Sequence, residues 1–311
     1  AHAHGVKCYI TVNIMPSNRD LPALPAYLEL LQDAGADALI IADVGVLRMA
    51  RRYAPKVPVH ISTQTSILNH EAANYWADEG AERIVLAREL SLEEIAEIRA
   101  KTPKELEIEA FVHGAMCISY SGRCLISQYM TGRDANHGAC AQPCRWNYSL
   151  MEEKRPGQFF PVEEDGRGTY LYNSKDMCMI EHVPELIEAG ITSFKIEGRN
   201  KTAYYAACVT GAYRAAIDTY KKNPENFVLP QFCRDEVNKV SHREYYTGFY
   251  FGSEENGQHY GDSQYIREYE VVGMPVECDE SGKAVFGVSV GSLWHQIHDA
   301  LETEDYVDLQ S

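Results

Sequence analysis

One pattern recurs three times along the 311-residue chain: an amphipathic helical stretch ends in glycine and leads at once into a short apolar run. The three copies read LELLQDAGADALIIAD, NYWADEGAERIVLARE and PELIEAGITSFKIEG. Their glycines, Gly35, Gly80 and Gly190, stand where a helix C-cap needs a positive φ, which glycine adopts without steric cost. The apolar runs are continuous rather than alternating, as expected of parallel strands buried on both faces. The pattern therefore predicts an α/β fold with a parallel sheet.

Six strands are expected in all, with helical patterns between them. They cover residues 7–13, 37–43, 57–63, 83–89, 108–114 and 193–198. Several of these runs end in polar residues, among them Asn13, Asp43 and His113. Chemistry at the C-terminal ends of many different strands is typical of the TIM-type barrel. We therefore predict a (β/α)₈ barrel that lacks its first two βα units, in preference to a doubly wound sheet.

The helix–glycine–strand pattern stops after Arg199. A long helix with a Tyr-rich face is expected over residues 201–222, followed by a linker that contains proline and asparagine. From about residue 264 the sequence alternates around turn residues at 279–282, which indicates a β-hairpin. The expected organisation is a barrel over 1–252, with a Cys-rich insertion around 114–180, and then a linker and partial C-terminal β region over 253–311.

The charge of the chain limits how it can bind nucleic acid. The formal net charge is −16, which argues against RNA binding over the whole surface because phosphate binding relies on Lys and Arg. An RNA held by a local basic patch or by a further domain is still compatible with this charge. No stretch approaches the ~20 apolar residues of a membrane span, and no secretory signal precedes the first strand. We expect a cytoplasmic protein with no membrane partner.

Nine cysteines are present, and five of them fall within one fifth of the chain. These five are Cys117, Cys124, Cys140, Cys144 and Cys178. A disulfide scaffold is usual in short secreted chains, whereas clustered thiolates in a large chain suit an iron–sulfur cluster or zinc. The alternative is that they are small buried hydrophobic residues, but their Gly, Ser, Arg and Pro neighbours indicate loops. The residues alone thus predict a metal site on the loops of an α/β enzyme.

Four further residues are candidates for catalysis. His113, just before the first of these cysteines, is either a proton donor or substrate ligand, or a structural residue at a strand end. Lys195, Glu197 and Arg199 are two apart, so they share one face of a strand. They either hold an anion such as a dicarboxylate or form an ion-pair layer at the barrel mouth.

An aromatic stretch, SHREYYTGFYFG, offers two interpretations as well. Its rings either stack on the bases of single-stranded RNA or pack in the core against the barrel wall.

The Cys-rich segment HGAMCISYSGRCLISQYMTGRDANHGACAQPCRWNY resembles the signature region of the U32 family, known as collagenase-like peptidases. The similarity extends from Lys7 to about Gly252. It includes STQTSILNHEAANYW and VLARELSL upstream, and NSKDMCMIEHVPELIEAGITSFKIEGRNKTAYYAACV and SHREYYTGFYFG downstream. Within the family, the blocks SYSGRC, GRDANHGAC and KDMC are most similar to the branch that hydroxylates the wobble uridine of tRNA with prephenate.

This resemblance implies a specific chemistry. It implies a [4Fe-4S] cluster with Cys117, Cys124 and Cys140 as ligands, and with Cys178 as the fourth ligand or Cys144 in its place. It further implies prephenate as co-substrate, 5-hydroxylation of wobble uridine 34, the tRNA anticodon region as substrate and a possible protein partner from the same family.

Other functions are compatible with the family. Sibling branches act on a cytidine of ribosomal RNA or in quinone hydroxylation, so a non-catalytic iron–sulfur partner of another hydroxylase is one alternative. A peptidase is another, although neither G-x-S-x-G nor H-E-x-x-H occurs, and a Cys–His pair would have to be Cys117 with His113. The family's initial Pro-Ala-Gly strands are absent, and residues after about Phe286 no longer resemble its C-terminal β domain. We therefore expect a partial chain.

Overall fold

The computed structural model describes residues 1–117, 119–120, 124–146, 149–151, 159–161, 175–252, 265–266, 269, 274–278 and 284–287. The chain divides into two compact units, Ala1–Ile266 and Arg267–Ser311. Among the helices of the described ranges, none combines the length and apolarity that crossing a membrane requires.

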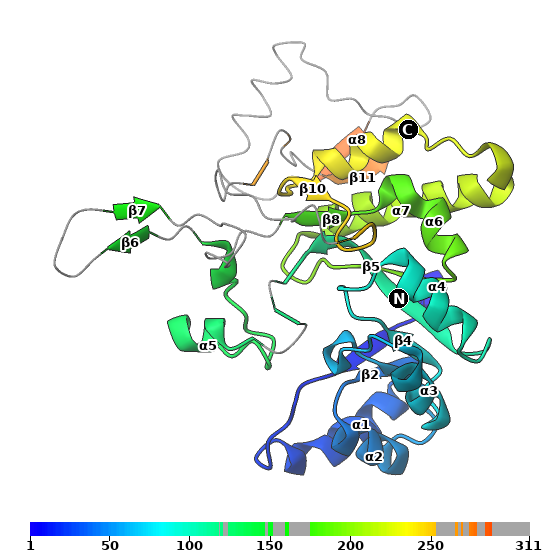
Figure 1. The fold of residues 1–311 in the computed structure, drawn as a ribbon. Coiled ribbons are helices and arrows are strands. Elements are labelled where there is room, and N and C mark those ends of the chain that lie inside the picture. Colours follow the sequence, from blue (N-terminus) through cyan, green and yellow to red (C-terminus); the bar gives the residue numbers. More distant parts are fainter. Residues whose placement is uncertain are drawn as a thin grey trace. The chain divides into compact units, whose positions relative to one another are not determined.

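The larger unit is built on an eight-stranded sheet (Figure 1). In spatial order the strands are β1 (Tyr9–Val12), β2 (Ala38–Ile41), β3 (Val59–Ile61), β4 (Arg83–Val85), β5 (Glu107–Ala115), β8 (Asp176–Cys178) and β10 (Tyr245–Tyr246), with β9 (Ser193–Ile196) pairing with β5 off this path. Every pair is parallel except β5 with β8. The predicted α/β class and parallel sheet are confirmed. Over the described strands the sheet is not closed, so the complete barrel stays a prediction.

Eight α-helices accompany the described strands. They are α1 (Leu24–Asp33), α2 (Val44–Tyr53), α3 (His70–Asp78), α4 (Leu92–Ala100), α5 (Ile126–Thr131), α6 (Val183–Glu188), α7 (Ala203–Lys222) and α8 (Gln231–Lys239). The core forms where the apolar strand residues meet helix residues such as Leu28 of α1, Ile95 of α4 and Val209 of α7. The strands present apolar side chains toward the helices, and each helix buries an apolar stripe against them. This burial holds the layers together.

The local predictions from glycine and capping residues are confirmed. Gly35, Gly80 and Gly190 have φ values of 75°, 73° and 85°, and each ends a helix before a strand. Ser91 and Glu94 form the reciprocal capping box at the start of α4. These caps satisfy orphan backbone groups, so the sequence specifies where each helix stops or starts.

Two short strands escape prediction. β8 has three residues and pairs with the end of β5, and β10 has two residues and pairs with β8. Both strands result from this pairing, because neither is long enough to show a periodicity of its own. Outside the sheet, β6 (Ser149–Met151) pairs with β7 (Phe159–Pro161). In the smaller unit, β11 (Met274–Cys278) and β12 (Ala284–Gly287) pair antiparallel, which confirms the predicted hairpin. Its predicted turn at 279–282 lies outside the described residues.

Candidate functional site

The end of β5 brings three of the predicted site residues together. His113 stands opposite Cys178 in the antiparallel register with β8. The backbone N–H of Glu197, just after β9, donates to the carbonyl of His113 at 2.9 Å. Between them Gly114 has a φ of 106°, and a Cβ at this position would collide with the backbone of Glu197. Glycine at this position therefore allows Glu197, the residue after β9, to approach the end of β5 this closely.

His113 is enclosed by tyrosines and is only 1% exposed. Its Nδ1 lies 3.5 Å from the Tyr213 hydroxyl, and its Nε2 lies 3.4 Å from the Tyr245 hydroxyl. Both hydroxyls donate to backbone carbonyls, Tyr213 to Val112 at 2.8 Å and Tyr245 to Val237 at 2.7 Å. Burial lowers the pKa of His113 to about 3, so the imidazole is neutral near pH 7. In this geometry His113 holds β5 against α7 and β10.

Cys178 lies beside the same tyrosine cage. Burial raises the pKa of its thiol to about 11, and hydrogen bonds from the Ile180 backbone and the Tyr213 side chain offset this only in part. The free thiol is therefore protonated near pH 7. Since metals bind the thiolate, binding at Cys178 would release a proton.

A network of charged side chains lies on one face of β4, β5 and β9. Glu109, nearly buried on β5, accepts from Lys195 at 2.6 Å, from Arg83 at 2.9 Å and from Ser193 at 2.8 Å. Arg83 also donates to Glu107 at 2.7 Å. Burial pushes the pKa of Glu109 upward, but Lys195, Ser193 and Arg83 together bring it below its ordinary value. The carboxylate stays ionised and fixes both cations.

The three charged residues of the FKIEGR segment have separate partners. Lys195 pairs with Glu109, whereas an oxygen of Glu197 accepts from the backbone N–H of Arg199 at 3.1 Å. The Arg199 side chain is exposed. A guanidinium in such a position is available to an anion from solvent, because its charge is permanent and its donors form a planar fork.

The cysteines of the insertion lie on segments that follow β5. Cys117 is exposed, and Cys124, Cys140 and Cys144 are half-buried. The Cys140 sulfur accepts from the backbone N–H of Gln142 at 3.4 Å. Within the part of the chain that the structure describes, no three His, Cys, Asp or Glu side chains are grouped so as to hold a metal ion. The thiols are the right donors for iron, but their convergence on one point stays a prediction.

Sequence reasoning missed several polar residues near Cys178. Asp176, 1% exposed, accepts from the backbone N–H of Arg243 at 3.2 Å and lies 3.7 Å from the Lys201 ammonium. The tyrosines were partly visible in the sequence: Tyr205 and Tyr213 are eight residues apart, which puts them near one stripe of α7. Tyr245 and Asp176 carry no such signal, because their positions depend on pairing between distant strands.

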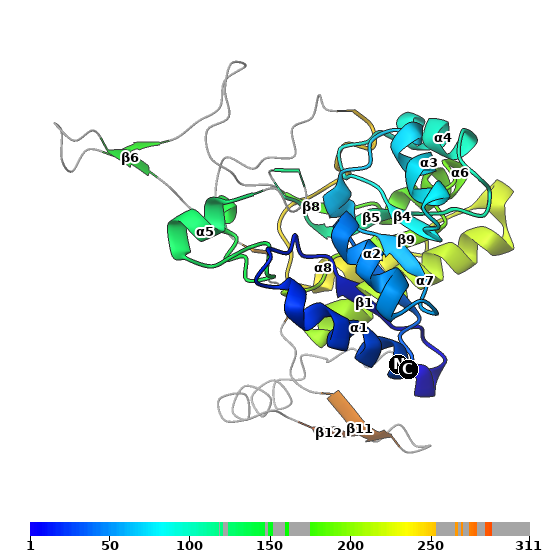
Figure 2. The ribbon, with the colours of Figure 1, turned by 90° about the horizontal axis from the view of Figure 1, so that it is seen from below.

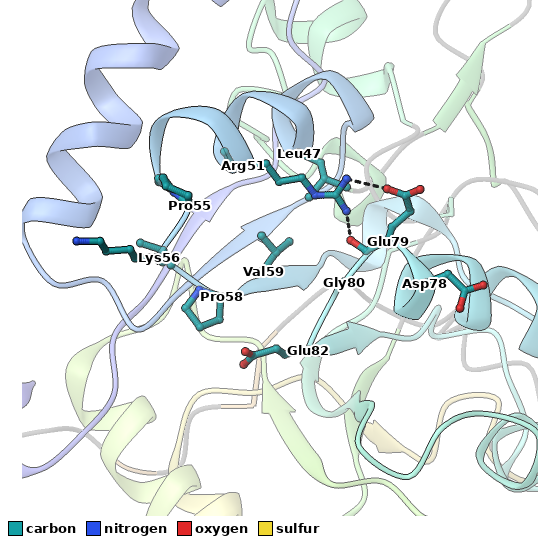
Figure 3. Close-up of a pocket in the computed structure, with 13 residues that line it drawn as sticks. Leu47, Arg51, Pro55, Lys56, Pro58, Val59, Asp78, Glu79, Gly80 and Glu82 are labelled. Carbon is teal, nitrogen blue, oxygen red and sulfur yellow. Dashed lines mark hydrogen bonds and ion pairs between the residues drawn. The ribbon is translucent and has the colours of Figure 1, made fainter.

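A pocket of about 390 Å³ opens at the opposite ends of the strands, beside the start of β3 (Figure 3). Arg51 of α2 crosses its rim, donating to the Glu79 carboxylate at 2.8 Å and to the Glu79 backbone carbonyl. Lys56 and Glu82 also line it. Polar contacts at the N-terminal ends of parallel strands usually serve stability, so we do not place the functional site in this pocket.

The mostly parallel sheet, together with polar side chains gathered where β5 and β9 end, defines the chain as an α/β protein with its candidate site at the carboxyl ends of strands. Comparison with known proteins identifies the family. Residues 1–260 match the model of peptidase family U32.

Characterised relatives share a third or more of the residues. The tRNA hydroxylation protein P1 of Bacillus subtilis is 41% identical over 288 residues, covering 92% of this chain and 67% of that protein. The tRNA hydroxylation protein P of Escherichia coli is 38% identical over 288 residues, covering 80% and 63%. The 23S rRNA 5-hydroxycytidine C2501 synthase of Escherichia coli is 38% identical over 218 residues, covering 70% and 32%. This chain belongs to the U32 family, and it spans about two thirds of the length of the two tRNA hydroxylation proteins.

Proposed function

We propose that this chain is part of an RNA hydroxylase that converts wobble uridine 34 of tRNA to 5-hydroxyuridine, with prephenate as co-substrate. One observation supports the proposal most: relatives named as tRNA hydroxylation proteins are 41% and 38% identical over most of the chain. A relative named as an rRNA hydroxycytidine synthase extends the same base chemistry to a second RNA.

A [4Fe-4S] cluster is part of the proposal. Its ligands would be Cys117, Cys124, Cys140 and Cys178, with Cys144 as the alternative to Cys178. Four thiolates are the donor set that such clusters take, so the residue types fit. When bound, the cluster would supply one-electron chemistry. Cys178 is fixed by the register of β8 with β5. Cys117 follows two residues after the end of β5.

The chain's own charged groups would bind the dicarboxylate co-substrate. Lys195 is neutralised by Glu109, so its role is to hold β9 against β5. Arg199 is exposed three residues after β9 and is the better candidate for a carboxylate, which a guanidinium can bind through two parallel hydrogen bonds. His113, neutral and buried, would maintain the strand ends rather than donate a proton.

Analysis of tRNA from cells tests the proposal. Deletion of the gene should remove 5-hydroxyuridine-derived nucleosides from position 34, as measured by mass spectrometry of digested tRNA, and the full-length gene should restore them. Unchanged wobble nucleosides in the deletion strain, with no second family member present, would rule the proposal out.

A further inference from the structure

Three tyrosines of the aromatic stretch near the end of the larger unit are buried or half-buried. Tyr250 is 4% exposed, and its hydroxyl donates to the Phe111 carbonyl at 2.5 Å. Tyr245 and Tyr246 are half-buried in β10. For these three residues of SHREYYTGFYFG, the structure therefore favours packing against the sheet over stacking on RNA bases.

A different set of aromatic and apolar side chains is exposed, and it lies on the Cys-rich segment that follows β5. Tyr129 is 92% exposed, Leu125 is 77%, Tyr120 is 50% and Trp146 is 44%. Both views show α5, which carries Tyr129, outside the layers formed by the sheet and its helices (Figures 1 and 2). We call these four residues the aromatic surface. None of these four side chains belongs to the buried core of the larger unit.

Residues 127–141 of this segment, which include Tyr129, are anchored by hydrogen bonds. The Ser127 hydroxyl donates to the Arg133 carbonyl at 2.9 Å and accepts from the backbone N–H of Ala141 at 2.9 Å. The Asn136 side chain makes two hydrogen bonds with the backbone of Met15, at 2.9 and 3.1 Å. Anchoring of this kind reduces the conformational entropy that a ligand would have to remove on binding.

The charge of the segment differs in sign from that of the whole chain. Residues 117–146 contain Arg123, Arg133 and Arg145 and one acidic residue, Asp134, whereas the chain as a whole has a net charge of −16. The segment thus has a formal net charge of +2 from these residues. A segment that combines a positive net charge with exposed rings suits unpaired nucleotides, because phosphates need cations and bases need flat faces.

We propose that the aromatic surface binds unpaired nucleotides of the RNA substrate, with Tyr129 stacking on a base. The inference rests on the proposed function and deepens it, since it names where the RNA docks. It places the base-binding surface on the same segment as Cys117, Cys124 and Cys140. An anticodon loop offers unpaired bases that can leave their own stack, which double-stranded RNA does not.

Equilibrium binding tests this surface. The natural full-length protein would be purified anaerobically, and fluorescence anisotropy would measure its affinity for a labelled anticodon stem–loop. Tyr129→Ala should weaken binding roughly 5- to 100-fold, the range expected for loss of one stacked base. Tyr129→Phe keeps the ring and should bind as wild type does. Tyr75→Ala, at a 53% exposed tyrosine of α3, is the matched control and should have no effect.

The outcomes distinguish an error in the docking surface from an error in the proposed function. If Tyr129→Ala binds the stem–loop as tightly as wild type while wild type modifies tRNA, the docking surface is wrong and the proposed function stands. If the variant instead loses iron, or changes its oligomeric mass in light scattering, the surface serves the metal site or a protein partner and the proposal is overturned. If wild type, fully loaded with iron and sulfide, leaves tRNA unmodified, the proposed function itself fails.

Discussion

His113 and His60 are buried in the neutral form, and this makes the folded state sensitive to acid. Burial lowers the pKa of His113 to about 3 and, with the nearby charge of Arg83, that of His60 to about 4. In the unfolded chain both rings bind protons near pH 6.5, so below that pH the unfolded state binds more protons than the folded state. The contribution of these two neutral histidines to the free energy of unfolding is therefore fully present above pH 6.5. It decreases as the pH falls toward their pKa values in the folded state.

We expect the free energy of unfolding to decrease between pH 7 and pH 5, by roughly 1.4 kcal/mol per pH unit for each histidine once the pH is below 6.5. Urea unfolding at several pH values measures this slope. The pKa of Glu109 is lowered in the folded state, so its protonation changes the stability only below about pH 4.5. It therefore does not affect the slope between pH 7 and pH 5. His113→Asn should flatten the slope, and a wild-type stability that is constant from pH 7 to pH 5 would contradict the assignment.

Glu109 is the residue on which the charge network depends. Replacing it by Gln would leave Arg83 and Lys195, which are only 12% and 29% exposed in their side chains, without their shared carboxylate. We expect Glu109→Gln to destabilise the fold by about 1.5–3 kcal/mol, because Lys195 would lose this carboxylate and Arg83 would keep only its contact with Glu107. The measurement is again urea unfolding. Glu107→Gln is the control: its side chain is 49% exposed, so the loss should be below about 1 kcal/mol, and equal losses would argue against the network.

At the scale of elements, the junction of β5 with β9 depends on Gly114. Alanine there would combine a φ of 106° with a collision against the backbone of Glu197. We expect Gly114→Ala to destabilise by about 1–3 kcal/mol, measured by thermal or urea unfolding. Gly211→Ala is the opposite control: it lies inside α7 with open space around it, so it should stabilise by about 0.5–1 kcal/mol. Destabilisation of similar size in both variants would show that the junction is not special.

Elements whose signals are local were predictable from the sequence. Gly35, Gly80 and Gly190 fixed helix ends because only their backbone conformation matters, and the six predicted strands followed from continuous apolar runs, although β1 and β9 are only partly buried. β8 and β10 were not predictable, since strands of two or three residues have no period and arise from pairing with residues 60 or more positions away. For the same reason the cage of Tyr213 and Tyr245 around His113 could not be found, although the Tyr-rich face of α7 was visible.

The identity of the fourth cluster ligand is an element-scale prediction too. Cys178 is held by β8 next to β5, whereas Cys144 lies in a short 3-10 turn, Pro143–Arg145. We expect Cys178→Ser to lower the iron and sulfide content of anaerobically purified protein markedly, and Cys144→Ser to leave it close to that of wild type. The reverse pattern would assign the site to Cys144, and a zinc-bearing, iron-free protein would remove the cluster altogether.

At the scale of the whole molecule, a strongly acidic chain is proposed to act on a polyanion. The sequence reconciles these facts by leaving residues 117–146 with a single acidic side chain against three arginines, so that this segment is positive in an acidic chain. Long-range repulsion would then oppose non-specific RNA binding, while the local surface selects unpaired nucleotides. The family similarity covers residues 1–260, so both features belong to the shared part of the chain.

Reconstitution tests the central claim most directly. The full-length protein, loaded with iron and sulfide, would be incubated with unmodified tRNA under anaerobic conditions, with and without prephenate, and position 34 would be analysed by mass spectrometry. The account predicts a gain of one oxygen at uridine 34 that requires prephenate and is lost in Cys117→Ser. Unmodified uridine in the presence of prephenate and a full complement of iron, or cleavage of gelatin by the same preparation, would contradict it.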